Sequence, residues 1–225
     1  KSDSLGGQFL LAGAISAKKD FKNAVDKMIL DVQESGIEVH LNTAVTKEML
    51  EEIKPDALIV AIGSSPIVLP IEGSERTIIA HDVLSEKVEV SGENVVVIGG
   101  GLVGFETAEF LAARQKKVTV LEMKEKALQD LGPLRQITAQ FAMAQMPITI
   151  ETSATVERIE DHAVVASGKE YPYDSVIMAV GSKANDISMY TDLGIPTYIV
   201  GDCKKAGVAL DAFKDAYHAV LEINK

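Results

Sequence analysis

Three glycines and one glutamate near the middle of the chain have the types and spacing of a dinucleotide-binding turn. Gly99, Gly101 and Gly104 follow a short apolar run, and Glu122 follows the next one. In such a turn the first glycine permits the tight bend, the second lets the backbone approach a pyrophosphate, and the third allows close packing of the following helix. The alternative is that these glycines only tighten a turn.

The glutamate indicates which nucleotide binds. A carboxylate at the end of the second strand accepts a hydrogen bond from a ribose 2′-hydroxyl and repels a 2′-phosphate, so Glu122 favours NAD(H) over NADP(H). Lys124 weakens this preference, because a cation two residues further on is able to partner a phosphate. Met123 lies between them and is expected to contact the same nucleotide.

The flanking elements must position these residues. The run 95–98 is typical of a strand buried on both faces of a parallel sheet, 102–113 suits a helix, and 117–121 suits a second strand. The N–H groups and the dipole at the start of the helix would then face the phosphates. Leu102 and Val103 therefore join the predicted binding residues.

The same strand-then-glycine pattern recurs elsewhere in the chain. It ends at Gly63 in LIVAIG, at Gly181 in VIMAVG and at Gly201 in YIVGD. The remaining strands are expected at 37–41, 57–62, 148–151, 154–159, 163–166, 175–180 and 198–200, and the helices at 20–34, 46–53, 133–144 and 208–223. This order predicts an α/β protein with a Rossmann-like parallel sheet, and 66–92 is interpreted as a connection between domains.

Composition excludes several classes of function. The 225 residues carry a net charge of −11, which disfavours binding to nucleic acid. Neither an apolar run of about 18 residues nor a signal-peptide pattern is present, so a cytoplasmic location and no membrane partner are expected. The single cysteine excludes an internal disulfide, and the four histidines lack metal-ligand spacing, so no metal site is predicted.

Several motifs together make the chain resemble the pyridine-nucleotide side of flavoprotein disulfide-reductase-like enzymes. The nearest likeness is to the C-terminal half of the large NADH:flavin oxidoreductases, which include 2-enoate reductase, 2,4-dienoyl-CoA reductase and trimethylamine dehydrogenase. The resemblance covers nearly the whole chain. Its motifs are LGGQF at 5–9, LNTAVT at 41–46, KPDALIVAIGSSP at 54–66, VVVIGGGLVGFETAEFLA at 95–112 and VGDC at 200–203.

This resemblance implies an interrupted domain arrangement. Residues 1–91 correspond to the later part of an FAD-binding domain, 92–186 to an inserted NAD(P)-binding domain, and 187–225 to the return into the first domain. The family's first βαβ unit for FAD and its N-terminal barrel, with FMN, the substrate site and an iron–sulfur cluster, have no counterpart here. We therefore expect the chain to be a fragment of a longer parent protein that binds FAD. The missing barrel and FAD half-domain of that parent would be its partners.

The missing unit predicts weak or absent FAD binding in the fragment itself. It would remove about three to five charge-assisted hydrogen bonds of about 1.5–3 kcal/mol each. The resemblance leaves Asp202 as an acceptor for a flavin ribityl hydroxyl, with a turn or helix cap as the alternative. By the same resemblance, Ile62 replaces the usual threonine before Gly63, so any contact from that hydroxyl is lost and only the backbone role remains. Glu106 matches an acid near the nicotinamide, or is a solvated helix residue.

The resemblance implies an oxidoreductase that passes hydride from NAD(P)H to FAD, with a parent that reduces an activated C=C bond. No side-chain acid or base is required, so no catalytic residue is predicted, and the fragment alone is expected to be inactive. One alternative is an FAD-dependent NADH reductase for a rubredoxin or ferredoxin. Another is a non-catalytic NAD-sensing module.

Overall fold

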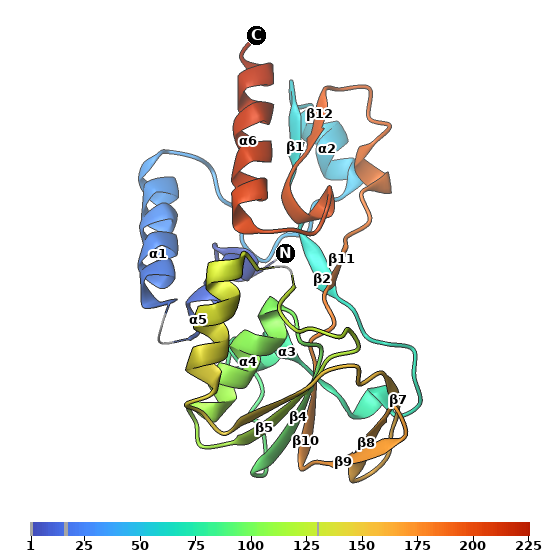
Figure 1. Ribbon diagram of the computed structural model, residues 1–225. Helices are drawn as coiled ribbons and strands as arrows, with labels where there is room; N and C mark the ends of the chain where they lie inside the picture. The colour runs from blue at the N-terminus through green and yellow to red at the C-terminus, as the bar shows by residue number, and fades with distance from the viewer. Residues whose placement is uncertain (1, 16–17, 130) are drawn as a thin grey trace. The chain divides into compact units, whose positions relative to one another are not determined.

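The computed structural model describes residues 2–15, 18–129 and 131–225 (Figure 1). The chain folds into two compact units, each built from separated segments. The first unit contains Lys1–Phe9, Asn23–Ser65 and Ser182–Lys225, and the second contains Leu10–Lys22 and Pro66–Gly181. Within the described residues, no helix has both the length and the apolar character needed to cross a bilayer.

The second unit is built on a five-stranded sheet with the order β3-β10-β4-β5-β6. All four pairings are parallel. The strands are β3 (Ile78–Ile79), β4 (Asn94–Ile98), β5 (Lys117–Leu121), β6 (Ile148–Glu151) and β10 (Ser175–Met178). Its helices are α3 (Ala80–Leu84), α4 (Leu102–Ala112) and α5 (Pro133–Met143).

Both faces of this sheet are buried, which explains the continuous apolar runs. Val95 and Val97 of β4 face one core cluster with residues of α3 and α4. Val96 and Ile98 face the other cluster, which contains residues of an antiparallel three-stranded sheet. That sheet consists of β7 (Val156–Ile159), β8 (Ala163–Ala166) and β9 (Lys169–Pro172). The parallel sheet is therefore enclosed between helices and a second sheet (Figure 1).

The first unit contains smaller sheets. The strands β1 (Leu58–Val60) and β12 (Thr197–Ile199) pair in parallel, and β2 (Ser64–Pro66) pairs with β11 (Ser182–Ala184). The helices are α2 (Lys47–Ile53) and α6 (Ala209–Ile223), while α1 (Lys19–Glu34) belongs to the second unit in its first turn and to the first unit afterwards. Its short 3-10 helices are η4 (Ser188–Tyr190) and η5 (Gly201–Cys203), while η3 (Ser74–Arg76) belongs to the second unit and η1 (Gly7–Gly13) is divided between the two units.

The sequence signals for helix ends are confirmed at several places. Thr46 caps α2 by accepting a hydrogen bond from the Met49 N–H at 3.4 Å. Gly36, at φ +77°, follows the end of α1, as expected for a C-terminal glycine. The helices α4, α5 and α6 lie within one residue of their predicted bounds. The predicted α/β class with a parallel sheet is confirmed.

Three expectations about elements need correction. The segment 37–41 forms no strand, and its apolar Ile37 and Leu41 are 62% and 43% exposed. Alternation alone predicted a strand there, but within the described residues no neighbouring strand pairs with it. The supposed connection 66–92 contains β3 and α3, whose Val83 is buried. The strands β2, β9 and β11 lacked a clear apolar pattern and were not predicted.

Candidate dinucleotide-binding site

The glycine turn joins the carboxyl end of β4 to the start of α4, and each glycine has a separate steric reason. Gly99 has φ +109°, and a Cβ there would lie 2.4 Å from the carbonyl oxygen of Ala179. A Cβ on Gly104 would lie 1.9 Å from the carbonyl oxygen of Gly99, so the helix start packs directly on the turn. A Cβ on Gly101 would have no atom within 4 Å, which leaves open space beside the helix N-terminus.

Glu122 is part of this turn. Its side chain is 8% exposed, and Oε2 accepts a hydrogen bond from the Gly100 N–H at 2.8 Å. Oε1 accepts one from the Lys124 N–H at 2.8 Å. A carboxylate offers about four acceptor positions, and these two hydrogen bonds occupy two of them. The predicted acid therefore lies beside the predicted turn.

Gly100 is a residue that the sequence interpretation missed. A Cβ at this position would lie 2.8 Å from Cβ of Glu122, so only glycine lets the carboxylate approach. The spacing pattern assigns no role to this residue, because G-x-G-x-x-G leaves it free. The run of three consecutive glycines, Gly99 to Gly101, was the available signal.

Leu128 also holds the glycine turn in place, and the sequence interpretation missed it. Its N–H donates to the carbonyl oxygen of Gly100 at 2.9 Å, and its side chain is 2% exposed. It belongs to a small core cluster with Phe105 of α4 and Met143 of α5. The loop after Glu122 is therefore anchored to the core, which the polar sequence 124–132 did not indicate.

The other predicted nucleotide contacts lie at or near the same end of the sheet. Leu102 and Val103 form the first turn of α4 and are half-buried, and Val103 packs against the core. Met123 is 67% exposed and Lys124 is also exposed, directly after Glu122. Gly181 has φ +102°, a Cβ there would have no atom within 4 Å, and its carbonyl accepts from the Ile67 N–H.

Glu106 is not a solvated helix residue. It is 8% exposed and forms an ion pair with Lys18. One turn further along α4, the pKa of Glu109 is raised above its usual range by burial and by the Glu106 carboxylate, while Lys18 partly offsets this. The helix that follows the glycine turn thus carries two neighbouring acids, of which Glu106 is buried and Glu109 is half-buried.

The flavin-related residues of the prediction lie in the first unit. Gly63 and Gly201 adopt φ of +72° and +65° at the carboxyl ends of β1 and β12. Asp202 is half-buried, and its Oδ2 accepts a hydrogen bond from the Ser64 hydroxyl at 2.9 Å. Cys203 is 3% exposed, and its thiol donates to the Val60 and Val200 carbonyls, so it is a packed core residue.

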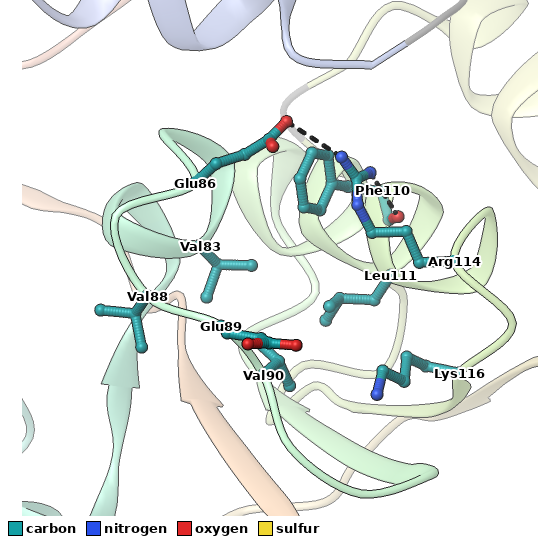
Figure 2. A pocket seen from close by; sticks show the side chains of 9 residues that line it. All are labelled: Val83, Glu86, Val88, Glu89, Val90, Phe110, Leu111, Arg114 and Lys116. Carbon is teal, nitrogen blue, oxygen red and sulfur yellow. Dashed lines mark hydrogen bonds and ion pairs between the residues drawn. The ribbon is translucent and has the colours of Figure 1, made fainter.

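A hollow of about 370 Å³ lies at the far end of α4 from the glycine turn (Figure 2). The Arg114 guanidinium stacks over the Phe110 ring at 3.5 Å and bonds the Glu86 carboxylate at 3.0 Å. Ligands of parallel α/β sheets bind at the carboxyl ends of the strands. This hollow lies at the amino end of β4 and is therefore separate from the dinucleotide site.

Comparison with known proteins identifies the family. Residues 12–204 match the family of the pyridine nucleotide-disulphide oxidoreductases. The chain belongs to this family. Its resemblance to NADH:flavin oxidoreductases is thereby confirmed, because its relatives include an NADH oxidase, a cinnamate reductase and a 2-naphthoyl-CoA reductase.

The relatives are similar over almost the whole chain. The chain is 33% identical to the NADH oxidase of Thermoanaerobacter brockii, and the alignment covers 99% of this chain and 36% of that protein. It is also 33% identical to the cinnamate reductase of Clostridium sporogenes, and that alignment covers 99% of this chain and 35% of the reductase. The structure of 2-naphthoyl-CoA reductase with 2-naphthoyl-CoA matches with a TM-score of 0.89 at 30% identity. The match covers 97% of this chain and 34% of the reductase chain. The chain spans about a third of the length of these relatives.

Proposed function

We propose that this chain binds NADH at the turn formed by Gly99, Gly101, Gly104 and Glu122, and that it is the NADH-binding part of a longer flavin-dependent oxidoreductase. One observation carries the proposal: the buried Glu122 carboxylate bonds to the Gly100 N–H, so acid and turn form one site. The open space at Gly101 fits a pyrophosphate, and the N–H groups at the start of α4 fit its charge.

Each part of the nucleotide has an assigned neighbour. Glu122 accepts the adenosine ribose hydroxyls, and Met123 and Lys124 border the adenosine end. Leu102 and Val103 lie beside the phosphates, while Gly181 borders the nicotinamide end. The negative charge of Glu122 selects against a 2′-phosphate, so NADH is preferred over NADPH.

We further propose the domain arrangement 1–91, 92–186 and 187–225, with the middle segment for the nucleotide and the outer two for FAD. The part 66–91 of the first segment packs within the compact second unit, together with the nucleotide segment. Gly63, Gly201 and Asp202 fit the ribityl end of a flavin, and a further segment would supply the rest of the FAD cradle. Binding of FAD to this chain alone is then weak. Relatives of about three times this length are consistent with that arrangement.

Hydride transfer from nicotinamide C4 to flavin N5 is chemistry that the two cofactors supply. The residues of this chain bind and orient the nucleotide, and none has to act as acid or base. By similarity to the cinnamate and 2-naphthoyl-CoA reductases, the whole protein reduces an activated C=C bond. FMN and an iron–sulfur cluster would belong to the further segment.

Titration with NADH and NADPH tests the site. Wild type should bind NADH more tightly. Glu122→Ala should weaken NADH binding about tenfold or more, since a hydrogen bond to a charged group is worth about 1.5–3 kcal/mol. Glu122→Gln should reduce the preference for NADH, because the charge is lost. Glu125→Gln, an exposed acid in the following loop, is the matched control and should change neither affinity.

Equal affinity of the wild type for both nucleotides would overturn the assignment of Glu122. Hydride transfer is tested separately by adding the remaining part of the protein, loaded with flavin, and following NADH absorbance. Oxidation of NADH supports the oxidoreductase role. Binding of NADH without oxidation would favour a nucleotide-sensing module instead.

A further inference from the structure

A hydrogen-bonded chain of side chains ends on Asp202 in the first unit. Ser64 is 7% exposed, and its hydroxyl donates to Oδ2 of Asp202 at 2.9 Å. The other oxygen, Oδ1, accepts from the Gly207 N–H at 3.2 Å. Both carboxylate oxygens are thus held in place from the protein side.

Gln8 fixes the direction of the serine hydroxyl. Its side-chain Nε2 donates to the Ser64 carbonyl oxygen at 2.7 Å and lies 3.3 Å from Ser64 Oγ. A carbonyl only accepts, so this contact determines which end of the Gln8 amide faces Ser64. Because Oγ receives a hydrogen from Gln8, its own hydrogen points to Asp202.

We propose that Ser64 and Gln8 are positioning residues that hold Asp202 as the acceptor for the hydroxyls of a ribityl chain. The inference rests on the proposed flavin site of the first unit and adds to it the two residues that orient its acid. Of about four acceptor positions on a carboxylate, Ser64 and Gly207 occupy two, which leaves about two for ligand hydroxyls.

The turn at residues 62–65 is held by a second set of hydrogen bonds, which involves Ser65 rather than Ser64. Ser65 donates to Oδ1 of Asn185 at 2.6 Å, and Asn185 in turn donates to the Ile62 carbonyl at 2.8 Å and to the Gly63 carbonyl at 3.2 Å. These contacts hold the turn without Asp202. The Ser64 hydroxyl instead donates to the Asp202 carboxylate.

Two flavins that differ only in their side chain provide the test. Riboflavin has a ribityl chain, whereas lumiflavin has a methyl group in its place. The 225-residue chain should bind both flavins weakly, because the rest of the FAD cradle lies outside it, but should bind riboflavin more tightly than lumiflavin, as measured by quenching of flavin fluorescence at high protein concentration. Ser64→Ala should reduce the ratio of the two affinities about fivefold to tenfold, and Asp202→Asn should do so at least as much. Gln8→Ala should give a smaller reduction.

Controls separate positioning from general damage. Ser65→Ala should leave the ratio unchanged, and Ser64→Thr, which keeps a hydroxyl, should restore most of it. The double variant Ser64→Ala/Asp202→Asn should resemble Asp202→Asn alone. A loss of folding would weaken both flavins equally and leave the ratio unchanged.

Three results would overturn the inference: a wild type that binds the two flavins equally or not at all, a Ser64→Ala variant that keeps the circular-dichroism spectrum of the wild type but shows an unchanged ratio, or a Ser65→Ala variant with the same loss. NADH titration of the same variants tells this failure apart from failure of the dinucleotide site. That site lies in the second unit, so its affinity for NADH should be unaffected by every variant at Ser64 or Asp202.

Discussion

Glu122 is both the proposed ribose acceptor and a hydrogen-bond acceptor for the backbone of the glycine turn. The residue type and its place after β5 predicted a ribose acceptor, and the structure adds that the carboxylate bonds to the backbone of the turn and loop at Gly100 and Lys124. A sequence pattern could indicate the acid because strand, turn and helix occur in a fixed order. It could not indicate the bonds to N–H groups, since these depend on where a buried side chain lies in space.

Glu109 gives a prediction for pH dependence. Burial first, and then the Glu106 carboxylate, raise its pKa above the ordinary value of 4.5, and Lys18 partly offsets them. Because this pKa is raised in the folded protein, the protonated acid stabilises the fold below pH 4.5. That contribution is lost as the pH rises through the folded-state pKa.

Glu109→Gln should therefore increase the free energy of unfolding at pH 7, while the two proteins should differ little below pH 4.5. The expected gain is below about 1 kcal/mol, since the group is about half exposed and solvent screens its charge. Urea unfolding at both pH values measures it, with the exposed Glu52→Gln as control. A variant that is less stable at pH 7 would contradict the inferred charge repulsion.

At the scale of elements, two glycines of the turn between β4 and α4 should affect different properties, one the affinity for NADH and the other the stability of the fold. Gly101→Ala places a methyl group in open space, so stability should change by less than about 0.5 kcal/mol, whereas NADH affinity should fall about tenfold or more. Gly104→Ala should instead destabilise the fold by about 1–3 kcal/mol, because the methyl group meets the Gly99 carbonyl. Thermal unfolding and NADH titration of both variants distinguish these effects.

The elements also show where sequence patterns succeed. The bounds of β5, β6 and β8 were predicted to the residue, because each lies in a sheet whose neighbours are present. The segment 37–41 has an equally good alternating pattern, yet it forms no strand. A strand needs a hydrogen-bonding neighbour as well as alternation, and the pattern of one segment carries no information about its neighbour.

At the scale of the whole molecule, the two units have sheets of very different extent. The second unit has five parallel strands with buried residues on both faces, whereas the first has two pairs of strands. Two-stranded sheets are marginal by themselves in water. We therefore expect the backbone amides of β4, β5 and β10 to exchange hydrogen much more slowly than those of β1 and β12.

This difference predicts how NADH acts on the whole chain. A ligand stabilises the state that binds it by RT ln(1 + [L]/Kd), which is about 2.7 kcal/mol at a hundredfold excess over Kd. Because the proposed site lies entirely in the second unit, NADH should slow exchange in β4, β5 and α4 and leave β1, β12 and α6 unchanged. Hydrogen exchange followed by mass spectrometry measures both groups in one sample, and Gly101→Ala provides the control that binds poorly. Equal protection of both units would mean that they unfold together, whereas protection of β1 and β12 alone would place the nucleotide in the first unit.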